Sequence, residues 1–231
     1  MLRKGITLLL FLFVFSPVFA QVFIHPYVIR GEVYVDLEPI YAGHIDEEYP
    51  LDMTAASRRA LEEAAMFFSA MIYGWSFTYE PGERARQLDE IIEMQMLGAI
   101  KYGDPALRVT ETELRDMRLR VWMDYHLNDS HQRRMQVWRT GMIRNANAIG
   151  YGPSHIDEYP GWLALKNIAL EDAARAALRQ ALRGSERNRP KSVTGFISLA
   201  SFPRYYIESG RWAASARFRI QIVEIIPFAA Y

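Results

Sequence analysis

The chain repeats part of its own sequence, and this feature limits the folds open to it more than any other. Residues 44–50 (His-Ile-Asp-Glu-Glu-Tyr-Pro) recur, one residue shorter, at 155–160. Two further pairs of similar segments follow in the same order, 60–65 with 169–174 and 118–121 with 217–220. Ordered matches of this kind indicate a duplicated structural unit, so we expect two tandem repeats.

Each repeat is predicted to be an α+β unit made of a leading strand, one helix and a three-stranded antiparallel meander. Residues 211–226 alternate between apolar residues such as Phe218 and polar residues such as Arg219, which is the period of a half-buried strand. Glu208-Ser209-Gly210 has the composition of a hairpin turn. The other predicted strands are 192–200 and 204–207 in the second repeat, 93–101, 106–110 and a strand burying Met117, Leu119, Val121 and Met123 in the first, and leading strands at about 28–40 and 135–149.

A helix is predicted in the first repeat, where apolar residues from Leu61 to Trp75 recur at three- and four-residue spacing. Asp52 or Thr54 is the expected N-terminal cap, and Pro81-Gly82 is the expected stop.

The second repeat has an alanine-rich helix at 162–183, which we expect Gly184 to end. Its small side chains would let it lie close against a sheet. An insertion at 83–92 in the first repeat is predicted to form a short additional helix.

The N-terminus has the three parts of a cleavable signal peptide. Arg3 and Lys4 form a short basic segment, residues 5–15 are almost entirely apolar, and Val18-Phe19-Ala20 places small residues where signal peptidase cleaves. The apolar run is shorter than the roughly 20 residues that cross a bilayer. We therefore expect a signal peptide at 1–20, a first repeat at 21–128, a second repeat at 129–231 and no integral membrane segment after cleavage.

The composition restricts the partners and the chemistry of the mature protein. The chain has no cysteine, so it lacks a lipid-modified cysteine, disulfide bonds and thiolate metal ligands. Without Arg3 and Lys4, 25 basic residues face 27 acidic ones, and no run of one sign occurs. We therefore expect a periplasmic protein with no nucleic-acid partner, since such a partner requires a basic face.

The duplicated His-Ile-Asp-Glu motif is where titratable residues cluster. His44 and Asp46 would point the same way in an extended segment, as would His155 and Asp157, so each pair could hold a metal or act as a base and its orienting group. The interpretation that we favour is structural, with each motif leading the chain into its helix, so that no catalytic or metal-binding residue and no cofactor are predicted. The sequence has no Gly-x-Ser-x-Gly, His-Glu-x-x-His or phosphate-loop motif.

Partner contacts are predicted at two places. Trp122 lies beside Arg118 and Arg120 on the polar face of its predicted strand, and tryptophan and arginine are enriched at protein interfaces. The alternative is that a second layer of the fold covers Trp122. The apolar C-terminus, with Phe228 and Tyr231, is expected to be a docked tail or a partner contact.

The segments 169–178 (Ala-Leu-Glu-Asp-Ala-Ala-Arg-Ala-Ala-Leu) and 217–222 (Arg-Phe-Arg-Ile-Gln-Ile), which follow a strand, resemble the small α+β domain of exported bacterial lipoproteins and of the flagellar-assembly proteins FlgP and FlgT. The resemblance covers about 140–226 and, more faintly, 30–126. It implies a non-catalytic structural or assembly protein of the envelope, with other envelope or flagellar proteins as partners. The alternatives are a metal-dependent hydrolase that uses His44, Asp46, His155 and Asp157, or a small-ligand carrier with its pocket between the repeats.

Overall fold

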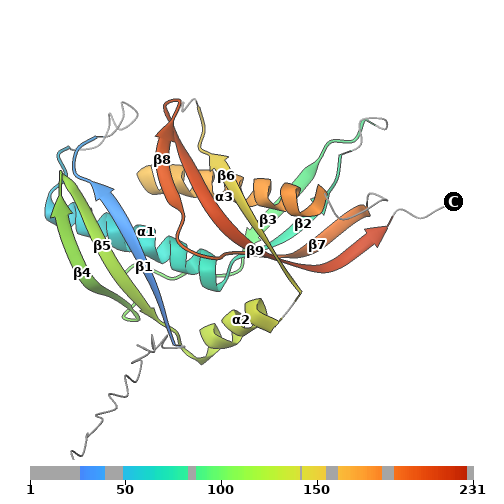
Figure 1. Cartoon of the computed structure of the whole chain (residues 1–231), viewed down its shortest axis with the longest axis horizontal. Coiled ribbons are helices and arrows are strands. Elements are labelled where there is room, and N and C mark those ends of the chain that lie inside the picture. Colours follow the sequence, from blue (N-terminus) through green and yellow to red (C-terminus); the bar gives the residue numbers. More distant parts are fainter. Residues whose placement is uncertain are drawn as a thin grey trace, which may run out of the picture.

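The computed structural model describes residues 27–39, 49–82, 87–140, 142–154, 161–183 and 190–227. These residues form an α+β fold, as predicted, in which α1 lies between two antiparallel sheets (Figure 1). The elements, in chain order, are β1 (Val28–Asp36), α1 (Met53–Ile72), β2 (Trp75–Glu80), β3 (Ile91–Met96), β4 (Leu107–Arg115), β5 (Arg118–His126), α2 (Asp129–Thr140), β6 (Ile143–Tyr151), α3 (Trp162–Arg183), β7 (Pro190–Leu199), β8 (Arg204–Glu208) and β9 (Arg211–Pro227).

The strands are divided between the sheets in a way that does not confirm the tandem repeat. The smaller sheet has the order β1-β5-β4, and the larger has the order β3-β2-β7-β9-β6, with β8 paired to β9. Strand β2 pairs antiparallel with β7, so the larger sheet takes strands from both sides of the expected boundary at residue 128. Helix α1 is also followed by four strands before α2, where the repeat predicted three.

Three local predictions between residues 83 and 149 were wrong. Ile91 and Ile92 lie in β3 rather than in a short helix. Exposed and half-buried side chains alternate from Ile91 to Met96, which suits an edge strand. That strand ends at Met96 and does not reach residue 101. The leading strand of the second half begins at Ile143, since residues 135–140 belong to α2.

Helix α1 is capped as predicted but ends earlier than expected. The side chain of Asp52 accepts a hydrogen bond from Ala55 N at 2.7 Å, which satisfies one of the open amides of the first turn. The helix stops at Ile72, before Gly74, whose φ of +64° suits a residue without a side chain. Trp75 therefore belongs to β2, and Pro81-Gly82 follows that strand instead of the helix.

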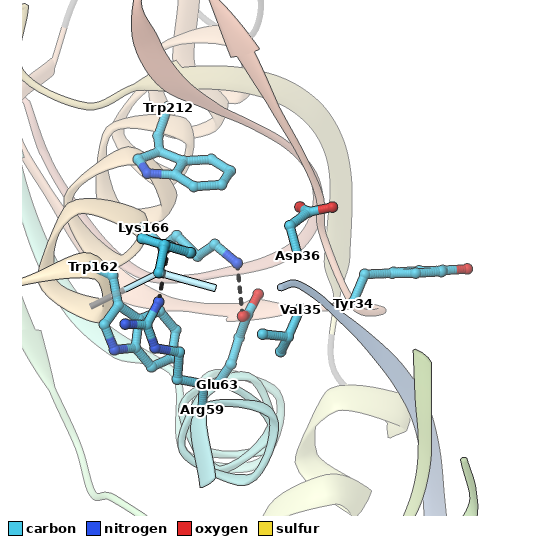
Figure 2. A pocket seen from close by; sticks show the side chains of 9 residues that line it. Tyr34, Val35, Asp36, Arg59, Glu63, Trp162, Lys166 and Trp212 are labelled. Atoms are coloured by element: carbon cyan, nitrogen blue, oxygen red, sulfur yellow. Dashed lines mark hydrogen bonds and ion pairs between the residues drawn. The ribbon is translucent and has the colours of Figure 1, made fainter. Parts of the chain in front are cut away.

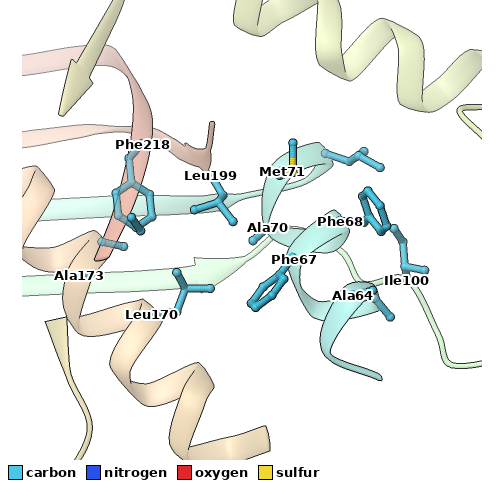
Figure 3. Close-up of a cluster of buried hydrophobic side chains, with 14 of the residues drawn as sticks. Ala64, Phe67, Phe68, Ala70, Met71, Ile100, Leu170, Ala173, Leu199 and Phe218 are labelled. Carbon is cyan, nitrogen blue, oxygen red and sulfur yellow. The ribbon is translucent and has the colours of Figure 1, made fainter. Parts of the chain in front are cut away.

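One continuous hydrophobic core joins the two sheets through α1. Phe67 and Phe68 are both buried, and Figure 3 shows Phe67 facing Leu170 of α3 while Phe68 faces Ile100 on the other side. Phe68 also packs against Tyr125 of β5, with a centroid distance of 5.5 Å, so α1 contacts both sheets and fixes the position of one relative to the other.

Helix α3 covers the larger sheet at very close range, as its alanine content predicted. Ala169, Ala173 and Ala177 are fully buried. A Cβ atom added to Gly150 of β6 would lie 1.9 Å from the backbone nitrogen of Ala173, so the helix rests on the strand backbone itself. The predicted buried face of β9 is confirmed at Phe218 and at its neighbours on that face, Trp212, Ala214, Ala216 and Ile220.

The predicted buried face of β5 is confirmed with one exception. Leu119, Val121 and Met123 are buried. Met117 is 44% exposed because it lies in the turn before the strand, with a φ of +56°. None of the helices in the described ranges is long and apolar enough to cross a membrane.

Candidate functional site

Six of the predicted site residues lie outside the described part of the chain. They are His44, Asp46, His155 and Asp157 of the duplicated motif and Phe228 and Tyr231 of the C-terminus. The residues that the structure describes include no group of three or more His, Cys, Asp or Glu side chains placed to hold a metal ion.

The predicted contact residues on β5 come together on the outer face of the smaller sheet. Arg120 lies over the ring of Trp122 at 4.2 Å from its centroid and forms an ion pair with Glu32 of β1 at 2.8 Å. Arg118 pairs with Asp36 at 2.6 Å. Both arginines therefore link β5 to β1, and the role of Trp122 as a partner anchor stays a prediction.

A cleft of about 820 Å³ lies between the two sheets. Strand β1 forms one wall, and β8 with the preceding residues Phe202 and Pro203 forms the other. The floor consists of Glu63 and Phe67 from α1, Lys166 from α3 and Trp212 from β9. Elements from both halves of the chain thus build this site.

A buried ion pair crosses the floor of the cleft. Lys166 Nζ donates to Glu63 Oε2 at 2.7 Å, and the two residues are 7% and 3% exposed. Figure 2 shows the pair reaching from α3 to α1 beside Trp162 and Trp212. Burial raises the pKa of the Glu63 carboxyl, and the Lys166 ammonium opposes this shift. The pair therefore connects the two helices at a point largely closed to water.

Aromatic rings surround the ammonium group of Lys166. Its Nζ lies 4.8 Å from the ring centroid of Trp212, 5.2 Å from that of Tyr205 and 5.7 Å from that of Trp162. Each ring presents its electron-rich face to the cation, which adds attraction to the ion pair. The Tyr205 hydroxyl also donates to the backbone carbonyl of Lys166 at 2.9 Å, and burial raises the pKa of this hydroxyl well above its usual value.

Phe202, which lines the cleft, lies close to Gly31 of β1. The ring of Phe202 lies where a side chain on Gly31 of β1 would be, 2.3 Å from an added Cβ atom. The same ring packs edge-on against Phe67 and Phe68, with centroid distances of 5.0 and 4.9 Å. Phe202 therefore fixes the spacing between β1 and the segment that leads into β8.

Sequence reasoning missed the cleft, although two single residues carried a signal. Lys166 interrupts the apolar positions of α3 between Leu165 and Ala169, and Glu63 does the same in α1 beside Ala64. A charged residue on a buried helix face needs a partner. Two such residues with opposite charges were therefore candidates for one buried pair.

The sequence matches the model of a protein family of unknown function over residues 21–228, and the chain belongs to this family. An uncharacterized protein of Treponema pallidum (strain Nichols) is 23% identical over 231 residues, which cover 93% of this chain and 94% of that protein. No solved structure matches the chain.

Proposed function

We propose that this protein is a non-catalytic component of the bacterial cell envelope that binds a segment of a partner protein in the cleft between β1 and β8. The observation that carries the proposal is the cleft itself, whose volume of about 820 Å³ is accessible between two strands at the edges of their sheets. Such a site takes a chain segment without any chemical step.

The side chains around the opening are of the kinds that favour protein contacts. Tyr34 on β1 is 41% exposed and Tyr206 on β8 is 39% exposed, so both walls present an aromatic ring to solvent. Arg204 is exposed and has no ion-pair partner among the described residues. Tyrosine and arginine are over-represented in protein interfaces.

The N-terminal sequence supports a periplasmic location, because residues 1–20 have the pattern of a cleavable signal peptide. The resemblance to FlgP and FlgT supports a role in an envelope assembly, with the flagellar apparatus as the first system to examine. The partner is then another protein of the envelope or the flagellum.

Site-specific cross-linking in living cells tests this function. A photoreactive phenylalanine analogue replaces Tyr206 in the cleft and, in a matched control, exposed Tyr102 away from it. We expect one envelope protein to be cross-linked from position 206 and not from position 102. Identical cross-linking patterns from both positions would contradict the proposal.

Two further measurements examine the alternative functions. A small molecule bound one to one in native mass spectra of the protein purified from its host would identify a ligand carrier instead. Stoichiometric metal in the mature protein that is lost in His155→Ala would favour the hydrolase. We expect neither result.

A further inference from the structure

The turn between β4 and β5 shows which backbone groups of β1 face the cleft. Asp116 and Met117 both have positive φ, 51° and 56°, as in a two-residue hairpin turn of type I′. The residues that flank such a turn exchange both backbone hydrogen bonds, so Arg118 directs its N–H and C=O toward β4. Leu119 and Val121 consequently direct theirs toward β1.

The register between β1 and β5 shows which residues of β1 direct their backbone N–H and C=O groups toward β5. Val35 lies opposite Leu119 and Val33 opposite Val121, so these two valines bond to β5. The bond from Leu37 N to Met117 O, at 2.8 Å, continues the same odd-numbered series. The N–H and C=O groups of Glu32, Tyr34 and Asp36 therefore point away from β5, toward the free edge.

This free edge of β1 borders the cleft. Glu32, Tyr34 and Asp36 all line it, and no described strand pairs with β1 on that side. Their three amides and three carbonyls form an open hydrogen-bonding row. Exposed sheet edges of this kind accept an extended peptide as an additional strand.

We infer that the partner segment binds as an extended strand along Glu32–Asp36 and becomes the fourth strand of the smaller sheet. This inference rests on the proposed function, since it specifies how the cleft holds its partner. Backbone hydrogen bonds to β1 provide the register, and the side chains of the segment alternate between the floor and the outer face of the sheet.

The lining of the cleft specifies the side chains of the segment. Residues that point to the floor meet Phe67, Tyr205 and Trp212, which favours apolar side chains. Around the cleft, Glu63 and Asp36 are neutralised by Lys166 and Arg118. Glu32 is paired with an arginine of β5.

The lining has three acidic and three basic side chains, and Arg204 is the basic residue among them that has no ion pair with a described residue. The complementary segment is apolar on alternate residues and has an acidic residue on its outer face.

A synthetic peptide tests strand addition directly. The probe is a fluorescein-labelled nine-residue peptide that alternates valine with threonine, with glutamate in place of the central threonine. Binding to the mature protein is followed by fluorescence anisotropy. N-methylation of one alternate set of residues is expected to weaken binding at least tenfold, because those N–H groups bond to β1, while methylation of the other set has much less effect.

Two variants at one position test the protein side of the same bonds. Tyr34→Ala and Tyr34→Pro both remove the ring, but the proline variant also removes the outward N–H. Proline is tolerated on the open side of an edge strand, and thermal unfolding verifies that both variants fold. We expect Tyr34→Pro to bind the probe at least tenfold more weakly than Tyr34→Ala does.

A charge swap tests the acidic residue. Arg204→Glu is expected to lose the preference for the glutamate peptide and to bind a peptide with lysine at the same position more tightly. Unchanged preference would refute the predicted chemistry of the segment.

The outcomes separate this inference from the proposed function. If cross-linking from position 206 succeeds but no peptide binds, or if N-methylation and Tyr34→Pro leave affinity unchanged, strand addition is wrong and cleft binding stands. If position 206 gives no specific cross-link, the proposed function itself fails.

Discussion

Removal of Lys166 with Glu63 left in place tests what holds the floor of the cleft together. The 2.7 Å separation corresponds to a gross attraction of about 6 kcal/mol at an effective dielectric constant of about 20. Loss of one member of a buried pair typically costs about 3–5 kcal/mol, because the other charge remains desolvated without its partner. We expect Lys166→Met to lower the free energy of unfolding by about that amount.

A second variant separates two contributions to the loss of stability, the unpaired Glu63 carboxylate and the lost packing of Lys166. In Lys166→Met/Glu63→Leu both charges are gone and apolar side chains fill the space, so most of the lost stability should return. Urea unfolding, followed by tryptophan fluorescence and by circular dichroism, measures all variants. Arg58→Met is the matched control on α1, the helix that carries Glu63. Arg58 forms an exposed ion pair with Glu62, and loss of this pair should leave the urea midpoint nearly unchanged.

The pH dependence provides an independent check on the same variant. Burial raises the pKa of Glu63 in the folded protein, and removal of Lys166 takes away the charge that opposes this shift. A carboxyl with a raised folded-state pKa binds its proton more readily in the folded than in the unfolded protein. The deficit of Lys166→Met should therefore shrink as the pH is lowered toward the ordinary glutamate pKa of about 4.5. The reasoning is refuted if Lys166→Met is as stable as the wild type, or if the double variant is no more stable than the single one.

Three further predictions concern two close glycine contacts and one buried histidine. Gly150→Ala should lower the free energy of unfolding by on the order of 3 kcal/mol in urea, because the added methyl group meets the backbone of Ala173; wild-type stability would contradict the close helix contact. Gly31→Ala should lower the free energy of unfolding by about 1–3 kcal/mol, because the added methyl group clashes with the ring of Phe202, and adding Phe202→Leu should recover part of this loss. If the double variant loses the sum of the two single-variant losses, the contact is contradicted. Burial lowers the pKa of His131, so stability should fall as the pH drops below about 6.5, where the unfolded chain gains a proton first. In His131→Gln the change in urea midpoint between pH 7.5 and 5.5 should be smaller, and an equal change would assign the pH dependence to other groups.

The second half of the chain could be predicted largely from local patterns. Alanine spacing predicted α3 at 162–183, and alternation predicted β9 within one residue of its observed end. The hairpin at Ser209-Gly210 has positive φ at both residues, 51° and 73°, as its composition indicated. These features depend on neighbouring residues, which a single sequence displays.

The pairing of β2 with β7 had no such signal. Trp75 continues the three-residue spacing of α1, so the stripe was extended through it, and the strand that begins there was missed. Thr78 pairs with Thr194, and nothing in either segment specifies this distant partner. The similarity between the two halves reproduced the order of several elements but did not determine which sheet each strand joins.

The cleft could not be predicted for the same reason. Glu63 and Lys166 are 103 residues apart, and their contact exists because α1 and α3 both lie against the larger sheet. The outward-facing groups of β1 depend on the turn between β4 and β5 and on the register between β5 and β1, which only the folded chain shows. A charged residue on the buried face of each helix indicated that it needed an ion-pair partner within the chain, but the sequence did not identify that partner.

Amide hydrogen exchange on the complex with the cross-linked partner tests the central claim most directly. In the free protein, the amides of Val33 and Val35 should exchange slowly and those of Glu32, Tyr34 and Asp36 rapidly, because only the valines bond to β5. With the partner bound, the three rapid amides should become protected while the valines change little. Protection that appears on β4 or elsewhere, with the edge of β1 still exchanging rapidly, would contradict the addition of the partner segment to β1.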